Sequence, residues 1–465
     1  MKDNKTFTKY KLFYIIYLGR MIMIKRKRRL KKNVKIVLFL LVIILFIVIF
    51  NILNKDNNLN INNIIKENKE EIITNIVSKI NNENIDKSFI TWIDNNYKNS
   101  LDNINKYLLA NEYNETMWHE VTNNTLIVLN DLYQDNYKNK DNVKIINGKK
   151  EEVTLSFIGD VSLADNWYIM PEYDKRNKKV YGILSEDVVN IMTTSDLMIV
   201  NSEFTVSDRG EKMKGKYYTF RASPKRLSIY EEMGVDLVTL ANNHVYDFGK
   251  DAFYDMLEAF KEYDIPYVGA GKNIEEAKRP YYFIINGYKI AFVNATRAEK
   301  IILTPEATET EGGVLRCYDP TMFSNVIKEA KENSDYVVAL VHYGKEDSHS
   351  LEKVQVDTSK LYIDSGADII IGTHAHVLQG IEFYKDKPII YNLGDFIFNN
   401  ETKDTGIFQI KMKFNKELEY YFIPCLEKDE YTKTLEGTEK QRVINNMISW
   451  SINANIDEEG KITKK

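Results

Sequence analysis

The sequence predicts an α/β domain with a mostly parallel β-sheet between residues 151 and 425. Two observations predict this fold. Short apolar runs alternate with segments of helical periodicity, which is typical of successive βαβ units. Each apolar run also ends in a polar cluster, and the ligands of parallel sheets bind beyond the carboxyl ends of the strands. We therefore expect the functional site at one edge of this sheet.

The composition limits the class of protein. The 465 residues suffice for two or three domains, and the formal net charge of −4 gives no reason to expect nucleic-acid binding. The two cysteines, Cys317 and Cys425, cannot build a disulfide framework, and nothing favours one bridge over two buried thiols. Most of the six histidines fall in one third of the chain, where we expect the chemistry: His244, His342, His349, His374 and His376.

The N-terminal region predicts a membrane anchor. Residues 36–50 are all apolar and the run extends to residue 53, enough for a helix of roughly 27 Å, close to the thickness of a bilayer core. A basic cluster at residues 25–32 precedes it. The positive-inside rule therefore predicts a cytoplasmic tail at 1–35 and an outward-facing remainder. A cleaved signal peptide is the alternative, but its apolar core is usually shorter and no small-residue cleavage site follows residue 53.

Residues 54–150 predict a helical spacer. They are rich in Asn, Lys and Glu, and apolar residues recur at near-helical spacing in three stretches. These stretches could pack as a small bundle, dock on the main domain, or form a flexible stalk with transient helices. His119 lies here beside Trp118 and is interpreted as a packing or surface residue. Residues 136–150 contain an Asn-Gly turn and are predicted to be a linker.

The elements of the main domain follow one another closely. Helices are predicted at 185–193, 227–233, 252–263 and 321–333, and strands at 153–158, 197–200, 236–240, 290–293, 336–341, 369–371 and 389–391. Residues 405–414 and 418–423 are strand-like and are expected to close a second sheet. For residues 426–465 we expect a helix at 441–452 followed by a frayed, charged tail.

The polar clusters at the strand ends offer potential metal ligands. An Asn or Asp after a strand is often only a turn former or a helix cap, but donors recur here at many strand ends. Oxygen donors mixed with imidazoles suit Mn, Fe or Zn better than Ca or Mg. The absence of a cysteine among them argues against a structural zinc site. The candidate ligand positions are Asp160, Glu203, Asn243, His244, His342, His374 and His376.

The stretch at residues 369–376 is the centre of this pattern. Its apolar run predicts a strand buried on both faces. Gly372 is expected to let the backbone turn sharply as the strand ends. His374 and His376 stand two residues apart, so in an extended segment both imidazoles would point the same way. A loop with two unrelated histidines is the alternative.

Six motifs stand at the predicted strand ends: Phe157-Ile158-Gly159-Asp160, Asn201-Ser202-Glu203-Phe204, Leu240-Ala241-Asn242-Asn243-His244, His342-Tyr343-Gly344-Lys345-Glu346, Gly372-Thr373-His374-Ala375-His376 and Asn392-Leu393-Gly394-Asp395-Phe396. Taken in series, they resemble the CapA family of bacterial capsule or poly-γ-glutamate synthesis proteins. The resemblance runs from about residue 153 to about residue 424. The family in turn resembles the calcineurin-like metallophosphoesterases, which implies a four-layer α/β/β/α sandwich with a metal centre at the strand ends.

The resemblance also implies roles for single residues. Asp160, Asn243, His342 and the histidines at 374 and 376 match metal ligands, and His244 matches a residue near the leaving group. The sequence departs from the superfamily pattern at Ser162, where the usual Asp-x-His motif has its histidine, and at residues 201–203, where Asn-Ser-Glu replaces Gly-Asp-x-x-Asp. Glu203 is therefore our candidate for the bridging carboxylate.

Further residues are candidates for supporting roles. Glu346, which we place with His244 among the catalytic candidates, and Asp395 could orient ligating imidazoles, as could Asn201. A solvated loop charge and a turn residue are the alternatives for the first two. Arg221 and Arg297 could grip an anionic substrate in bidentate fashion, although a surface position is favoured for Arg297.

These observations support two functions. The first is a membrane-anchored, outward-facing, metal-dependent hydrolase acting on an anionic envelope polymer or a phosphoester, with one or two divalent metal ions. The second is a non-catalytic subunit that binds or guides a nascent anionic polymer beside membrane-bound synthesis proteins. Nucleic acid is not an expected partner. The chain has no Gly-x-Ser-x-Gly elbow and no Gly-x-x-x-x-Gly-Lys loop, so a serine hydrolase and an ATP-driven ligase are not indicated.

Overall fold

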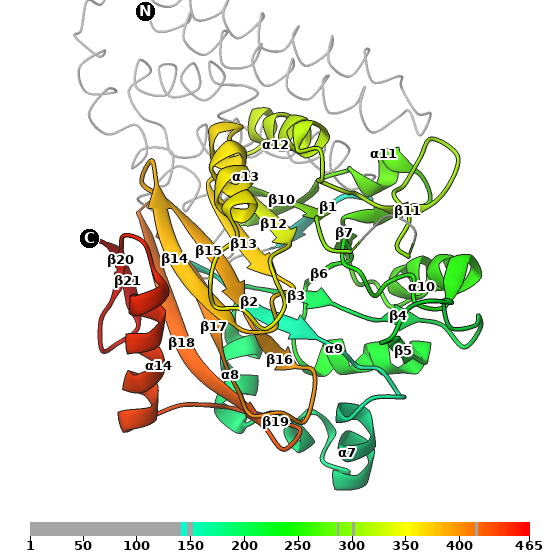
Figure 1. Cartoon of the computed structure of the whole chain (residues 1–465), viewed down its shortest axis with the longest axis horizontal. Helices are drawn as coiled ribbons and strands as arrows, with labels where there is room; N and C mark the ends of the chain where they lie inside the picture. The colour runs from blue at the N-terminus through cyan, green and yellow to red at the C-terminus, as the bar shows by residue number, and fades with distance from the viewer. Residues whose placement is uncertain (1–140, 147–151, 286–287, 300–302, 414–416) are drawn as a thin grey trace, which may run out of the picture. The chain divides into compact units, whose positions relative to one another are not determined.

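Two mixed β-sheets organise the part of the chain that the computed structural model describes, which is residues 141–146, 152–285, 288–299, 303–413 and 417–465 (Figure 1). The predicted membrane-spanning run at 36–53 and the spacer up to residue 140 lie outside these ranges. Within them, no helix combines the length and the apolar character needed to cross a bilayer.

The first sheet has seven strands, and its centre is parallel. Strands β10, β12, β13 and β15 run parallel to one another, whereas β9 pairs antiparallel with β10 and β14 antiparallel with β15. In spatial order the strands are β1 (Val143–Ile146), β9 (Tyr281–Ile285), β10 (Tyr288–Thr296), β12 (Tyr336–His342), β13 (Ile369–Thr373), β15 (Lys387–Leu393) and β14 (Leu378–Tyr384).

The second sheet has ten strands and is also parallel only where it carries the polar strand ends. Strands β2, β3, β6 and β7 are parallel, and β17 and β18 add antiparallel neighbours. In spatial order the strands are β20 (Ala454–Ile456), β21 (Lys461–Lys464), β18 (Leu418–Lys428), β17 (Lys403–Lys413), β2 (Glu152–Val161), β3 (Leu197–Ser202), β6 (Leu237–Thr239) and β7 (Tyr267–Val268), with β16 (Asp395–Ile397) beside β2 and β19 (Tyr431–Thr434) beside β18.

Alternation along the strands explains how the layers stack. In β12, Val338 and Leu340 face a core shared with the second sheet, while Val337, Ala339 and Val341 face a core shared with helices. Side chains of a strand point alternately to its two faces, so a strand buried on both faces has a continuous apolar sequence. Helices therefore cover the outer face of each sheet, and the two inner faces pack together.

Each helix packs on one of the two sheets through the hydrophobic clusters that its buried residues join, and Figure 1 shows where the helices lie. Helices α12 (Thr321–Glu332) and α13 (Lys353–Asp364) pack on the first sheet. Helices α8 (Glu186–Thr194), α9 (Ser228–Glu232) and α10 (Gly249–Glu262) pack on the second. Helix α14 (Gly437–Trp450) contributes Val443, Ile444 and Met447 to the core between the sheets. The shorter elements are α7 (Ile169–Arg176), η1 (Lys179–Gly182), β4 (Thr205–Val206), β5 (Arg221–Ala222), η2 (Pro224–Leu227), β8 (Ala270–Gly271), α11 (Ile274–Ala277) and β11 (Gly313–Val314).

The predicted helices are observed as α8, α9, α10 and α12, but the sequence did not reveal α13. The residues that α13 buries, Gln355, Thr358, Ser359, Tyr362 and Ile363, have helical spacing. Three of them are polar, so no apolar periodicity marks the helix.

Three other expectations are corrected. The sheets are mixed rather than mostly parallel, because hairpins such as β14–β15 and β17–β18 add antiparallel strands at their margins. The tail expected to fray instead forms the hairpin β20–β21, which pairs with β18. The predicted linker at 136–150 contains β1, which pairs with β9. In both segments a neighbouring strand completes the backbone hydrogen bonds.

Asp236 makes the stability of the fold depend on pH. It precedes β6 and accepts a hydrogen bond from the backbone N of Met198 at 2.9 Å. Burial raises the pKa of Asp236 to about 6, so the folded state favours the protonated form. Ionising the buried Asp236 lowers the free energy of unfolding. This loss of stability is absent at low pH, grows as pH rises from the pKa of the unfolded state to that of the folded state, and is complete above about pH 6.

We expect Asp236→Asn to remove this dependence, because an amide oxygen still accepts from Met198 and cannot ionise. The variant should gain stability relative to the natural protein by on the order of 2 kcal/mol between about pH 4.5 and about pH 7.5. Urea unfolding at both pH values measures the difference. A constant difference would contradict the assigned role of burial.

Candidate metal centre

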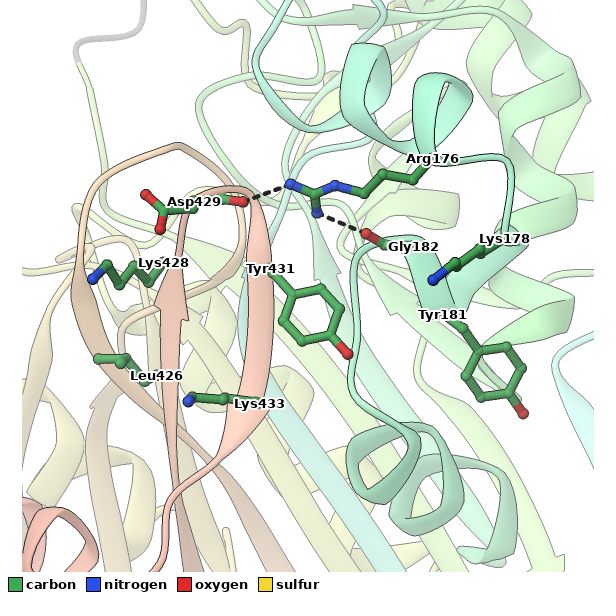
Figure 2. Close-up of a pocket in the computed structure, with 9 residues that line it drawn as sticks. All are labelled: Arg176, Lys178, Tyr181, Gly182, Leu426, Lys428, Asp429, Tyr431 and Lys433. Carbon is green, nitrogen blue, oxygen red and sulfur yellow. Dashed lines mark hydrogen bonds between the residues drawn. The ribbon is translucent and has the colours of Figure 1, made fainter.

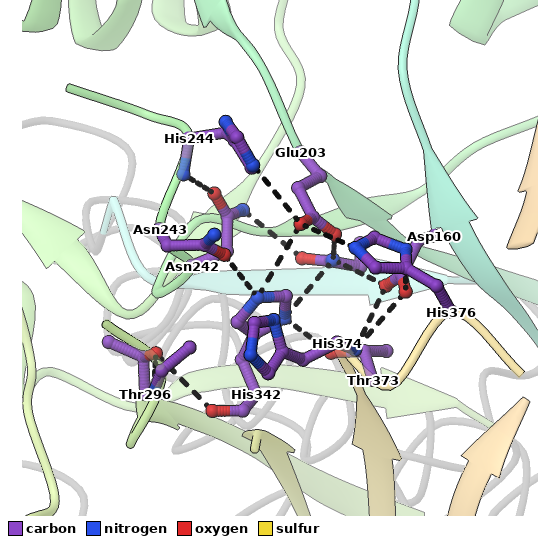
Figure 3. Close-up of polar contacts among 12 residues, drawn as sticks. Asp160, Glu203, Asn242, Asn243, His244, Thr296, His342, Thr373, His374 and His376 are labelled. Carbon is purple, nitrogen blue, oxygen red and sulfur yellow. Dashed lines mark hydrogen bonds and ion pairs between the residues drawn. The ribbon is translucent and has the colours of Figure 1, made fainter. Parts of the chain in front are cut away.

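A buried polar cluster lies where the carboxyl ends of the parallel strands of the two sheets meet (Figure 3). Asp160 comes from the end of β2 and Glu203 follows β3, both in the second sheet. His342 ends β12 and His374 follows β13, both in the first sheet. Three sets of donors have atoms within 4.8 Å of one another: Glu203 with His374 and His376, Asp160 with Glu203 and His342, and Asp160 with His376 and Asp395.

Oxygen Oε1 of Glu203 is at the centre of this cluster. It lies 3.6 Å from Nε2 of His342, 3.8 Å from Nε2 of His376 and 4.0 Å from Nε2 of His244. The atom is buried and has no hydrogen-bond partner among the described residues. Ligands that lie about 2.0–2.2 Å from one ion lie roughly 3–4 Å from each other. The spacing around Glu203 is therefore that of ligands around a metal ion.

Asn201 holds the two buried carboxylates together. Its Nδ2 donates to Oδ1 of Asp160 at 2.8 Å and to Oε2 of Glu203 at 2.9 Å. Burial raises the pKa of Asp160, and burial together with the neighbouring Asp160 charge raises the pKa of Glu203 well above its usual value. Two carboxylates in a buried space need a compensating cation, so this pair fits a bound metal ion.

The histidines at 374 and 376 reach the cluster by a different backbone path from the one predicted. Both have left-handed backbones, with φ of 94° at His374 and 57° at His376, so the segment is a tight turn and not extended. Gly372 lies inside β13 and does not make the turn. A Cβ there would come within 2.0 Å of the carbonyl oxygen of Tyr391, so the glycine is required by the close packing of β13 on its neighbour.

Asp395 and His376 form the closest pair in the cluster. Oδ1 of Asp395 lies 2.6 Å from Nδ1 of His376, which leaves Nε2 of the imidazole facing Glu203. Burial alone lowers the pKa of His376, but the carboxylates of Asp395, Glu203 and Asp160 outweigh it and raise the pKa well above its usual value. The other oxygen of Asp395 lies 3.3 Å from Nζ of Lys403. Asp395 thus orients one imidazole within a larger charged network.

The surroundings of His342 and His374 favour the neutral form of both imidazoles. Burial, followed by the charge of neighbouring histidines, lowers the pKa of both well below the usual value. Nε2 of His342 lies 2.7 Å from Oδ1 of Asn243, and Nδ1 lies 2.9 Å from the hydroxyl of Thr373. Nδ1 of His374 is buried without a partner among the described residues. A transition metal binds the lone pair of a neutral imidazole nitrogen, and Nδ1 of His374 is such a nitrogen without another partner in the described residues.

His244 is held by a residue that the sequence did not single out. Its Nδ1 lies 2.7 Å from Oδ2 of Asp247, and its ring packs 4.4 Å from the ring of Phe220. Burial lowers the pKa of His244, and the contact with Asp247 opposes that shift. The buried Lys216 bonds the other oxygen of Asp247 at 2.7 Å and donates to the backbone oxygen of Asn243. Asp247 follows His244 by three residues in one turn, and that spacing was the available signal.

The remaining candidates lie at the edge of the cluster or outside it. Glu346 is 59% exposed and its carboxylate lies 3.9 Å from Nε2 of His374. The guanidinium of Arg221 packs over the ring of Phe248 and donates to the carbonyls of residues 209 and 210. Arg297 packs over the ring of Tyr318 and donates to its carbonyl. None of these contacts brings either arginine to Glu203 or the histidines.

Neither cysteine supplies a reactive thiol. Cys317 and Cys425 are buried and free, as the sequence indicated. Burial raises the pKa of Cys317 to about 11 and also raises that of Cys425. A thiolate nucleophile is therefore not available at neutral pH from either residue.

Comparison with known proteins identifies the domain that carries this cluster. Residues 154–400 match the family model described as bacterial capsule synthesis protein PGA_cap. The capsule biosynthesis protein CapA of Bacillus anthracis is 32% identical over 279 residues, covering 57% of this chain and 66% of that protein. The PGA biosynthesis protein CapA of Bacillus subtilis (strain 168) is 30% identical over 270 residues, covering 57% and 68%.

The matched segment therefore spans about two thirds of the length of these relatives. Among solved structures, a 5′-nucleotidase from Candida albicans SC5314 is 12% identical, with 63% of this chain and 54% of that chain covered and a TM-score of 0.31. The family model covers more than half of the chain, and the chain therefore belongs to the family of bacterial capsule synthesis proteins, PGA_cap.

Proposed function

We propose that this chain is a CapA-like protein of capsule or poly-γ-glutamate synthesis or export, and that its buried cluster is a metal-dependent hydrolase site of the calcineurin-like type. The observation that carries the proposal is Oε1 of Glu203, a buried carboxylate oxygen without a hydrogen-bond partner in the described residues, which lies 3.6 Å from Nε2 of His342 and 3.8 Å from Nε2 of His376. The family membership and the names of the two relatives support the assignment to capsule or poly-γ-glutamate synthesis.

The residues present fit one or two divalent ions. Oxygen donors combined with neutral imidazoles suit Mn, Fe or Zn. The proposed ligands are Asp160, Glu203, Asn243, His342, His374 and His376, whose side chains converge from both sheets. When bound, such an ion supplies Lewis-acid activation of water and of the scissile group.

His244 is the proposed proton donor to the leaving group. Asp247 fixes Nδ1, so Nε2 points toward Glu203 and the site. An anionic substrate adds negative charge beside the imidazole and raises its pKa, which opposes the effect of burial. A proton held on Nε2 can then be delivered to the departing oxygen.

The anchor at residues 36–53 is part of the proposal. The apolar run and the preceding basic cluster support a single-pass protein with its main domain outside the cell and membrane-bound synthesis proteins as partners. Removal of residues 1–53 should shift the protein from the membrane fraction to the soluble fraction. Continued sedimentation with membranes would contradict the anchor.

A non-catalytic polymer-binding or scaffold role is the second candidate. One observation favours it: position 162 is Ser, where the superfamily pattern has a metal-binding histidine, and the hydroxyl of Ser162 is buried without a hydrogen-bond partner in the described ranges. A site with fewer ligands could bind metal without turnover.

Metal content and polymer production together test the hydrolase. The purified full-length protein should contain about one or two transition-metal ions per chain by elemental analysis and should hydrolyse a phosphoester or polyglutamate. Asp160→Ala and His376→Ala should each lose metal and polymer production. Full production by both variants would overturn the enzymatic proposal, whereas metal binding without turnover on either substrate would favour the scaffold.

A further inference from the structure

A basic cleft lies between the α7–η1 segment and the hairpin β18–β19 (Figure 2). Its volume is about 780 Å³. It is separate from the metal centre, and none of the proposed ligands lines it. The residues that line it are Arg176, Lys178, Tyr181, Gly182, Leu426, Lys428, Asp429, Tyr431 and Lys433.

The hairpin itself determines which side chains face the cleft. Asp429 and Glu430 form its turn with left-handed backbones, φ 52° and 55°, as a two-residue type I′ turn requires. Lys428 then pairs with Tyr431 across the hairpin, and Leu426 pairs with Lys433. Since strand side chains alternate between faces, these four share the outer face.

Lysines gather in this cleft without acidic partners. In the part of the chain that the structure describes, Lys178, Lys428 and Lys433 make no ion pair, and Asp429 is the one acidic residue of the lining. Lys428 and Lys433 are diagonal neighbours on one face of an antiparallel pair, roughly 7–8 Å apart at the backbone. Like charges this close repel, so their concentration in a concave surface favours an anionic ligand.

Arg176 gives the cleft a fixed shape. Its guanidinium donates to the carbonyl of Gly182 at 2.7 Å on one wall and to that of Asp429 at 2.8 Å on the other (Figure 2). It also donates to the carbonyl of Glu430 at 3.0 Å. Ion pairs with Glu172 at 3.3 Å and Glu430 at 3.8 Å neutralise the arginine. The arginine thus joins the two walls, and the lysines remain to bind a ligand.

We propose that this cleft binds a linear polycarboxylate chain, with the lysine ammonium groups pairing with successive carboxylates. The identity of the polymer rests on the proposed function, because the relatives are named for capsule and PGA biosynthesis. Compact lysine charges suit carboxylates spaced along a flexible chain. The two tyrosines, of which Tyr181 is 50% exposed, add hydroxyl groups that can donate to carboxylate oxygens.

The same hairpin connects the cleft to the metal centre. Its inner face carries Glu427, which accepts hydrogen bonds from the backbone N of Phe398 at 2.6 Å and of Asn399 at 3.1 Å. These residues directly follow β16, the strand that carries Asp395. A polymer held on the outer face is therefore tethered to the domain that contains the site, which raises its local concentration there.

Fluorescence anisotropy of labelled poly-L-glutamate with the full-length protein in detergent tests the proposal. The variant Lys428→Glu/Lys433→Glu should bind about tenfold or more weakly at low salt. The control Lys261→Glu/Lys328→Glu makes the same charge change on exposed residues of α10 and α12 and should bind within about twofold of the natural protein. Lys428→Gln/Lys433→Gln, a milder change, should give an intermediate loss.

The assay is repeated with chelator, and with His376→Ala, to separate the cleft from the hydrolase. Unchanged polyglutamate affinity in both arms, with loss only in the lysine variants, supports the cleft even if no turnover is found. Equal loss in the control variant, no binding of polyglutamate, or equal binding of single-stranded RNA would overturn it. Circular dichroism checks that the lysine variants are folded. If the glutamate pair does not fold, the affinity of the glutamine pair for polyglutamate is the test, and an intermediate loss supports the cleft.

Discussion

Replacing Glu203 by Gln is expected to abolish stabilisation of the protein by metal while leaving the metal-free fold at least as stable. The natural carboxylate is buried beside Asp160, and burial followed by that charge raises its pKa well above the usual value. A neutral amide removes this cost and can still accept the hydrogen bond from Asn201. It also removes the anionic donor that three imidazole nitrogens surround.

Thermal unfolding with and without added Mn²⁺ or Zn²⁺ measures the effect. An ion present at about a thousand times its Kd stabilises the natural protein by about 4 kcal/mol, and we expect essentially none of this in Glu203→Gln. Glu427→Gln is the matched control. That carboxylate is also buried, and burial raises its pKa as well, but its oxygen Oε1 accepts from two backbone amides. An undiminished metal effect in Glu203→Gln would exclude Glu203 as a ligand.

Parallel strands explain part of the convergence that the sequence predicted. Asp160 and Glu203 stand at strand ends of the second sheet, and His342 and His374 at strand ends of the first. Within each sheet the carboxyl ends of parallel strands lie at one edge, whereas the meeting of the two edges comes from the packing of the sheets. The rule for parallel strands needs only apolar runs and the polar residues after them. The CapA resemblance was carried by the same strand ends, and the family match confirms it.

The backbone path of the two histidines could not be predicted in the same way. Left-handed conformations at His374 and His376 are uncommon for residues with a Cβ. They are held by contacts from distant parts of the chain, such as Asp160 accepting from the backbone N of His374 and Asp395 bonding His376. Local sequence contains neither partner, so an extended segment was the natural expectation.

Lys216 shows the same limit for a supporting residue. It lies in a segment without regular structure, next to Tyr217, which is 90% exposed, yet its own side chain is only 4% exposed. Its ammonium group bonds Asp247 at 2.7 Å and Glu299 at 3.1 Å. No periodicity or motif distinguishes this lysine from its exposed neighbours. Only the tertiary fold brings the two acids to it.

Replacing His244 by Gln is expected to separate catalysis from metal binding. Metal content and metal-induced stabilisation should be retained, because His244 approaches Glu203 only to 4.0 Å and lies in none of the compact donor sets of the described residues. The rate of hydrolysis should fall by roughly 10²–10⁴-fold for substrates with poor leaving groups, which need a proton. Nitrophenyl phosphate, whose leaving group departs without one, should be affected far less.

Two companion variants show whether the loss reflects proton transfer. Asp247→Asn should lower the rate in the same leaving-group-dependent manner but by less, since it weakens the contact that orients Nδ1 of His244 and leaves the imidazole in place. His349→Gln is the control, because that histidine stacks on Trp450 at 4.0 Å, away from the donor cluster, and should leave the rate unchanged. Equal losses of His244→Gln on both classes of substrate would mean that the imidazole binds the substrate and does not protonate the leaving group, since binding interactions are indifferent to the leaving-group pKa.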